Sequence, residues 1–300
     1  MMREEGRIKE SGRVDLHLHT RNSDGENSVD QVIRQAAEEG IKVIAITDHN
    51  KFSLNRPFTE KNMEILPGCE FSASYMVSAQ NETVEIHVIG LFPDGVDPND
   101  FTGIFAGIHE GKRQYVKAIL EQLKERGISV SLEEVQAVSR KSGHIGRHQI
   151  ADVLIRKGYA EDVDDAFDRH IGNFSPYYIP STRYIRYAPL AQVVRQIVDS
   201  GGIPILAHPY GYLLNEENIE KLIADFKEVA GKTGAMEVYY ELYLDNPQRM
   251  TFLKRMAEKY GLLASAASDR HREGQPYATT DGLSFYREMV RVLHQNIGSG

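Results

Sequence analysis

Short apolar segments alternate with longer amphipathic ones along much of the chain. Residues 43–46 and 203–207 are continuously apolar, which is typical of strands buried on both faces of a parallel sheet. Other strands are predicted at 13–19, 64–70, 83–91, 235–239 and 262–265. Helices are predicted between 25 and 42 and over 189–200, 215–230 and 246–260. The alternation predicts an α/β fold with helices covering the sheet.

The pattern changes after a turn-rich segment at 94–100. From there to about residue 190 no strand pattern occurs, and helices are predicted over 102–126, 131–140, 147–157 and 161–171. We interpret this stretch as a helical insertion. The chain then divides into a first barrel part, the insertion and a second barrel part, at 13–100, 101–190 and 191–290.

Composition and charge restrict the possible partners. A chain of 300 residues with 41% hydrophobic content can bury the core of one barrel or of two domains. The formal net charge of -8 argues against a long nucleic acid as partner, because binding to its backbone requires an excess of Lys and Arg. The one cysteine, Cys69, excludes a disulfide framework and a thiolate zinc site, and we expect it in the core. The sequence shows neither a transmembrane run nor a secretion signal, so we expect a cytoplasmic protein with no membrane partner.

Histidines and carboxylates stand where predicted strands end. His17 and His19 are two residues apart, so in an extended strand both imidazoles point to one face and could hold one cation. Asp269 and His271 repeat this arrangement. Either pair alone is weak, because histidines near strand ends are more often ordinary polar groups. The remaining strand ends carry His49, Glu70, His87 and His208. Strand ends in β/α barrels collect on one face, so these side chains are expected to converge.

The motifs resemble those of a known family. His-Leu-His-Thr-Arg-Asn-Ser-Asp-Gly at 17–25, Thr-Asp-His at 47–49, Ala-His-Pro at 207–209 and Ser-Asp-Arg-His at 268–271 are similar to motifs of the PHP (polymerase and histidinol phosphatase) family. The resemblance implies a distorted seven-stranded (β/α)7 barrel, with phosphoesterase activity that depends on up to three metal ions. The chain departs from the family at Ala267, where glycine is usual.

The resemblance also implies which residues bind metal. One ion would be held by His17, His19, Glu70 and Asp269, a second by Glu70, His87 and His208, and a third by Asp24, His49 and His271. His208 and Asp269 would have a catalytic role as well. Imidazole and carboxylate ligands without thiolate suit two or three divalent ions of manganese, iron or zinc. Asp48 is expected to support a ligating histidine, and Glu237 to serve packing only.

The insertion carries candidate substrate contacts. Arg147 and His148 stand at a predicted helix start, where free backbone N–H groups and a guanidinium suit an anion. Arg169 is a weaker candidate, since arginines on helices are mostly solvated. Similar segments hold the substrate phosphate in the PHP branch of small-nucleotide phosphatases and RNA-trimming enzymes, and Tyr177 or Tyr178 could stack on a base.

We therefore expect a phosphoesterase that acts on a small nucleotide, either a 3',5'-bisphosphate or a monophosphate, or that trims short RNA ends. A hydroxide bridging two metals would attack the phosphorus in line with the leaving alcohol. One alternative is a histidinol phosphate phosphatase. Another is a metal-binding accessory module without turnover, although a degenerate module has no need of nine ligands.

Overall fold

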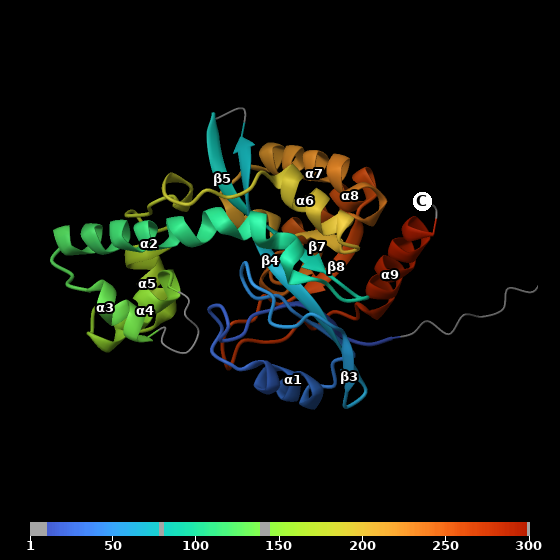
Figure 1. Ribbon diagram of the computed structural model, residues 1–300, viewed down its shortest axis with the longest axis horizontal. Coiled ribbons are helices and arrows are strands. Elements are labelled where there is room, and N and C mark those ends of the chain that lie inside the picture. The colour runs from blue at the N-terminus through green and yellow to red at the C-terminus, as the bar shows by residue number, and fades with distance from the viewer. Residues whose placement is uncertain (1–10, 78–80, 139–144, 299–300) are drawn as a thin grey trace, which may run out of the picture.

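A computed structural model describes residues 11–77, 81–138 and 145–298. Figure 1 shows a sheet with helices packed around it, and a separate group of helices that extends to one side. In the part of the chain that is described, no helix has the length and apolar character needed to span a membrane.

Seven strands form a barrel that is nearly closed. In their order around the sheet they are β1 (Val14–Leu18), β2 (Val43–Ile46), β4 (Met63–Val77), β5 (Glu82–Leu91), β6 (Ile203–Leu206), β7 (Ala235–Tyr240) and β8 (Leu263–Ala267). Leu18 pairs in parallel with Arg270, which brings the two edges together. β5 runs antiparallel to both β4 and β6, and this irregularity distorts the barrel. The prediction of a distorted seven-stranded barrel is confirmed.

Two features of the sheet differ from the predicted pattern. An additional short strand, β3 (Phe58–Glu60), pairs with β4 in a region predicted to be irregular. All three of its residues are exposed, so it carries no apolar pattern that could be recognised. β4 also continues past the predicted end at residue 70, because its distal half pairs with β5 as an antiparallel ribbon.

Amphipathic helices cover the barrel. They are α1 (Val29–Glu38), α6 (Leu190–Asp199), α7 (Glu216–Ala230), α8 (Pro247–Tyr260) and α9 (Leu283–Ile297), of which α9 was not predicted. Ser28 and Gln31 form a capping box that fixes the start of α1. Short 3-10 turns lie at Pro98–Phe101 (η1), Ser181–Arg183 (η4), Pro209–Tyr212 (η5), Gly231–Thr233 (η6) and Glu241–Tyr243 (η7).

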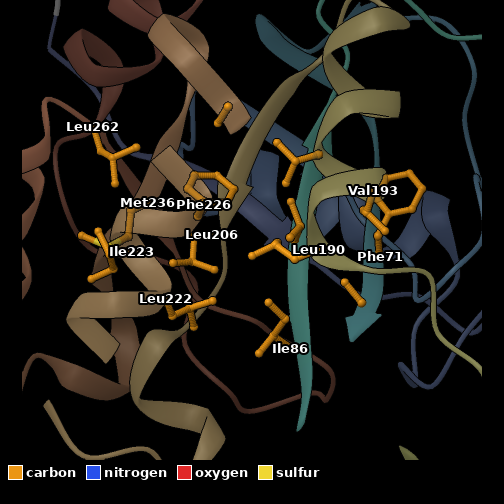
Figure 2. Close-up of a cluster of buried hydrophobic side chains, with 14 of the residues drawn as sticks. Phe71, Ile86, Leu190, Val193, Leu206, Leu222, Ile223, Phe226, Met236 and Leu262 are labelled. Atoms are coloured by element: carbon orange, nitrogen blue, oxygen red, sulfur yellow. The ribbon is translucent and has the colours of Figure 1, made fainter. Parts of the chain in front are cut away.

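The largest core of the described residues lies between the sheet and α6, α7 and α8. In Figure 2, Phe71, Leu206 and Met236 of the strands face Phe226 of α7 and Val193 of α6. All five side chains are completely buried. Burying one such side chain contributes about 1.5 to 3 kcal/mol, so this packing holds the strand ends in fixed positions.

The insertion forms a second body with its own core. It consists of α2 (Thr102–Glu125), α3 (Leu132–Val138), α4 (Arg147–Arg156), α5 (Val163–Ala166) and one π-helical turn, η3 (Phe167–Ile171). α2 leaves the barrel, and α3, α4 and α5 lie beside its far half (Figure 1). Buried residues such as Val116, Leu123 and Leu154 hold the body together. The last two residues of the helix predicted at 131–140, and the start of the segment at 143–148, lie outside the described residues.

Candidate metal centre and active site

Four ligand atoms meet at one point, from the end of β1, from the middle of β4 and from the segment after β8. The Nε2 atoms of His17 and His19 lie 3.0 Å apart. Each lies 3.1 to 3.3 Å from Oε2 of Glu70 and from Oδ1 of Asp269. A tetrahedral shell with metal–ligand bonds of about 2 Å has edges of about 3.3 Å, so this spacing suits one cation. These are the four residues expected to form the first site.

Glu70 is shared with a second group. Its Oε1 lies 2.7 Å from Nδ1 of His87 and 3.1 Å from Nε2 of His208, and its Oε2 lies 3.0 Å from Nδ1 of His49. Burial opposes ionisation of Glu70, but the surrounding His49, His87 and His17 outweigh it and hold the pKa of the carboxyl well below its ordinary value. The structure thus brings together the three residues expected at the second site and adds His49.

Asp24 is the centre of a third group. Its carboxylate lies 3.4 Å from Nε2 of His271, 3.5 Å from Nε2 of His49 and 3.5 Å from Nδ1 of His19. Nε2 of His148 lies 3.7 Å away, so this predicted substrate contact from the insertion reaches the same carboxylate. The barrel and the helical body therefore meet at the third group.

The hydrogen bonding of these groups fits a divalent cation. Several buried side-chain atoms in the described residues make no hydrogen bond, among them Oδ1 of Asp24, Oε2 of Glu70, Nδ1 of His87 and Oδ1 of Asp269. Buried polar atoms normally have partners, because leaving them unpaired is costly. These four point into the clusters, where a bound cation would satisfy them. Each cluster offers at least three nitrogen or oxygen ligands, which indicates binding of divalent metal.

Two supporting contacts were missed from the sequence. Oε1 of Glu237 accepts a hydrogen bond from Nδ1 of His17 at 2.7 Å, which leaves Nε2 free to ligate. Tyr240 donates its hydroxyl proton to Oδ2 of Asp269 at 2.8 Å. Glu237 was expected only to pack, yet a carboxylate inside the apolar strand at 235–240 needs a buried partner, and that requirement is the signal that could have identified it.

The structure corrects the expected role of Asp48. Its carboxylate accepts hydrogen bonds from the backbone and hydroxyl of Thr20, from the hydroxyl of Ser23 at 2.6 Å and from Ser53. These donors hold the loop that leads to Asp24. Among the described residues no histidine forms a hydrogen bond or ion pair with Asp48, because three neighbouring hydroxyls and a backbone N–H already occupy the carboxylate.

Unusual backbone conformations mark two of the strand ends. His208 has φ = 22° and Asp269 has φ = 56°, both in the region that side-chain-bearing residues rarely adopt. Such strain persists only where the surroundings fix the backbone, and it collects at functional sites. At His208 the backbone N–H donates to Oε2 of Glu237 at 2.6 Å, which holds this conformation.

A cavity of about 840 Å³ extends from the clusters to the helical body. Arg147 lines it and donates to Oδ1 of Asn173 at 2.5 Å. Lys112 of α2 also lines it and was missed, because a lysine on a long charged helix resembles a solvated one. Burial lowers the pKa of Lys112 to about 8. Lys112 and Arg147 therefore place two basic side chains in a cavity that adjoins the metal groups, and its lining also includes Arg249.

Arg169 lies elsewhere. It is not among the residues that line this cavity, and its side chain is about half exposed. Its guanidinium donates to the carbonyl of Tyr159 at 2.6 Å and lies 3.2 Å from Oδ1 of Asp165. These contacts fasten the helical body internally, so the structure does not support a substrate contact for Arg169.

The comparisons with known proteins agree with this arrangement. The family model for the PHP domain matches residues 15–179. The 5'-3' exoribonuclease Rnm of Escherichia coli is 30% identical over 86% of this chain and 85% of its own length. The 3',5'-nucleoside bisphosphate phosphatase of Chromobacterium violaceum is 28% identical over 87% of this chain and 88% of its own.

The fold has a solved counterpart. A structure from Bifidobacterium adolescentis, assigned as a metal-dependent phosphoesterase, superposes with a TM-score of 0.72 and 26% identity. The match covers 94% of this chain and 96% of that one. Together with the three carboxylate–histidine groups on one face of the barrel, these matches show that the chain belongs to the PHP domain family and is a metal-dependent phosphoric ester hydrolase.

Proposed function

We propose that the enzyme removes a phosphate from a small nucleotide, a 3',5'-bisphosphate above all, or trims the end of a short RNA. The observation that carries this proposal is the cavity beside the metal groups, which contains Arg147 and Lys112 as well as aromatic side chains such as Tyr178. A substrate matching it has more than one anionic group and a flat, weakly polar portion. The similarity to a bisphosphate phosphatase and to an exoribonuclease supports the same class of substrate.

The proposal includes two or three divalent ions. His17, His19, Glu70 and Asp269 would hold one; Glu70, His87, His49 and His208 a second; Asp24, His49, His19 and His271 a third. Bound there, manganese, iron or zinc would activate water and offset charge on the phosphoryl oxygens. Among the ligands, His208 and Asp269 are proposed to have the catalytic role.

The helical body supplies the substrate contacts. Arg147 is the first residue of α4, whose N-terminus has no side-chain cap, so backbone N–H groups remain available to an anion. His148 follows it and lies against the Asp24 group. We infer that the segment at 101–190 acts as a substrate lid, in which Arg147 binds a phosphate that the metals do not hold.

The runner-up substrate, histidinol phosphate, fits the cavity less well. It carries one phosphate and a cationic amine, whereas the cavity lining already includes Arg147, Lys112 and Arg249. Glu82 and Glu85 line the same cavity, so its charge is mixed, but a single phosphate would leave either the metal groups or Arg147 without an anionic partner. A module without turnover would leave the basic lining next to the metal groups without a purpose.

A substrate panel with manganese tests the proposal. It compares adenosine 3',5'-bisphosphate, adenosine monophosphates, histidinol phosphate and a short 5'-phosphorylated RNA under matched metal conditions. We expect inorganic phosphate to be released with the highest kcat/KM from the bisphosphate. A higher kcat/KM for the monophosphate or for histidinol phosphate would contradict the proposed use of Arg147.

A further inference from the structure

Three large apolar side chains stand exposed around the cavity that adjoins the metal groups. Phe174, Leu213 and Leu242 are 76%, 50% and 67% exposed, and all three line the cavity. They are three of the seven large apolar side chains that are exposed in the described part of the chain. Because they are lining residues and yet exposed, they lie at the open end of the cavity. We name them the apolar rim.

Both parts of the chain contribute to the apolar rim. Phe174 follows η3 in the helical body, whereas Leu213 follows η5 and Leu242 lies in η7, next to the ends of β6 and β7. A ligand at the rim would therefore contact the lid and the barrel together. This location separates the rim from the basic lining deeper in the cavity.

Phe174 is better suited to stacking than Tyr177, one of the two tyrosines expected from the sequence. The guanidinium carbon of Arg126 lies 3.3 Å from the ring centroid of Tyr177, so one face of that ring is already covered. Tyr177 is also absent from the lining of the cavity, while Phe174 is present in it. Phe174 leaves most of its surface open to a ligand.

Leu213 is unfavourable for stability in two respects. Its φ of 58° is left-handed, a conformation that is unfavourable for a side-chain-bearing residue and not for glycine. Its side chain is also half exposed, so the hydrophobic stabilisation from burial offsets little of this unfavourable backbone conformation. Folding alone favours glycine here. A ligand that contacts the side chain would explain why leucine is present.

We propose that the apolar rim binds the nucleobase of the nucleotide whose phosphates occupy the metal groups and the basic lining, an inference that rests on the proposed function. A nucleotide has an anionic end and a flat, weakly polar end, which matches a cavity with Arg147 and Lys112 beside the metal groups and apolar side chains at its mouth. The rim side chains carry no hydrogen-bonding groups. Recognition is by stacking and apolar contact, so the enzyme distinguishes a base from no base, but hardly one base from another.

Two substrates that differ only in the base provide the test. They are adenosine 3',5'-bisphosphate and 1-deoxyribose 3,5-bisphosphate, assayed with manganese. We expect Phe174→Ala to raise KM for the nucleotide roughly 10-fold with little change in kcat, in line with the loss of one aromatic stack. KM for the base-free compound should stay the same, and Phe174→Tyr should restore the nucleotide KM. Phe58→Ala is the matched control, because Phe58 is an exposed aromatic on β3 outside the cavity lining.

Leu213→Gly separates a ligand contact from a structural role. Relief of the left-handed backbone should leave Tm equal or higher, while KM rises for the nucleotide and not for the base-free compound. If Leu213→Gly lowers Tm and leaves the preference for the nucleotide unchanged, Leu213 has a structural role and the inference is overturned. Equal changes of KM for both compounds in Phe174→Ala would also overturn it.

Calorimetric measurement of Kd for the same two compounds tests the inference without requiring turnover. If the enzyme binds the nucleotide more tightly than the base-free compound, and Phe174→Ala removes the difference, the apolar rim binds the base even where neither compound is hydrolysed. Failure of hydrolysis alone would then contradict the proposed function and not the rim.

Discussion

Nδ1 of His17 lies 2.7 Å from Oε1 of Glu237, and both side chains are almost completely buried. The other oxygen of Glu237 accepts a hydrogen bond from the backbone N–H of His208. One carboxylate on β7 therefore orients the imidazole of His17 on β1 and fixes the backbone of a second proposed ligand. Partners of this kind usually change metal affinity by 10- to 100-fold.

The first prediction concerns this carboxylate. Glu237→Gln keeps the shape of the side chain but removes the charge that holds the His17 proton on Nδ1. We expect manganese affinity to fall about 10- to 100-fold, measured by calorimetric titration of metal-free protein. The control is Glu220→Gln, which changes a surface carboxylate paired with Lys259. If both variants bind manganese with the same affinity, Glu237 serves packing only and does not support the metal ligands.

A second prediction concerns Asp269. Its Oδ1 lies within 3.3 Å of Nε2 of both His17 and His19. Burial would raise the pKa of this carboxyl, but the nearby His17, His271 and His19 outweigh burial and hold the pKa well below its ordinary value. Asp269→Asn removes an anionic ligand, so bound metal and phosphatase activity should both decrease. Elemental analysis after manganese loading measures the first. Wild-type protein that retains no metal in that measurement would rule out the proposed sites.

A third prediction compares two arginines of the helical body. Arg147→Ala should lower kcat/KM for the bisphosphate, with a loss of about 2 to 3 kcal/mol of transition-state stabilisation, because a charge-assisted contact is lost. The metal content should stay unchanged. Arg169→Ala is the matched variant, because its guanidinium contacts Tyr159 and Asp165 outside the cavity. Steady-state kinetics of both variants decide the point. A loss in Arg169→Ala equal to that in Arg147→Ala would place the substrate elsewhere on the body.

The sequence predicted those parts of the site whose signal is local. His17, Glu70 and Asp269 each stand at the end of an apolar run, and barrel geometry then brings distant strand ends to one face. The barrel itself followed from the motifs and the alternation of strands and helices. The sequence did not predict β3, because a strand of three exposed residues has no apolar periodicity.

The remaining features depend on contacts between distant residues. Glu237 reaches its partner His17 across 220 positions, and no spacing rule connects them. Lys112 becomes a cavity residue only through the direction in which α2 leaves the barrel. Asp48 was expected to support a ligating histidine, but its carboxylate binds the hydroxyls of Thr20 and Ser23 instead, and the sequence does not show that these residues reach it.

The last prediction concerns the dependence of stability on pH in metal-free protein. Burial disfavours the cationic forms of His19 and His87, but the nearby carboxylates outweigh it and raise the pKa of each to about 10. Both values lie above the unfolded value of about 6.5. The stabilisation from these imidazolium–carboxylate contacts is therefore complete below about pH 6.5 and is lost as pH rises toward about 10.

Between pH 7 and 8 His17 acts in the same direction. Burial disfavours its cationic form, but Asp269 and Glu70 outweigh burial and hold the pKa of His17 well above its ordinary value. His148, whose pKa burial lowers to about 3, is neutral there. Burial lowers the pKa of Lys112 to about 8, so its partial deprotonation from pH 7 to pH 8 favours the folded protein, but this one group offsets only part of the loss from three imidazoles. We therefore expect Tm of metal-free protein to fall from pH 7 to pH 8. Because metal ligation requires neutral imidazole, manganese should displace the protons, raise Tm most at the higher pH and release protons on binding. Thermal scans with EDTA or manganese measure Tm, and calorimetry in two buffers of different ionisation enthalpy counts the protons. Two results would contradict this prediction: a Tm of the metal-free protein that rises from pH 7 to pH 8, or metal binding without proton release. Either result would show that the imidazoles are already neutral in the metal-free protein.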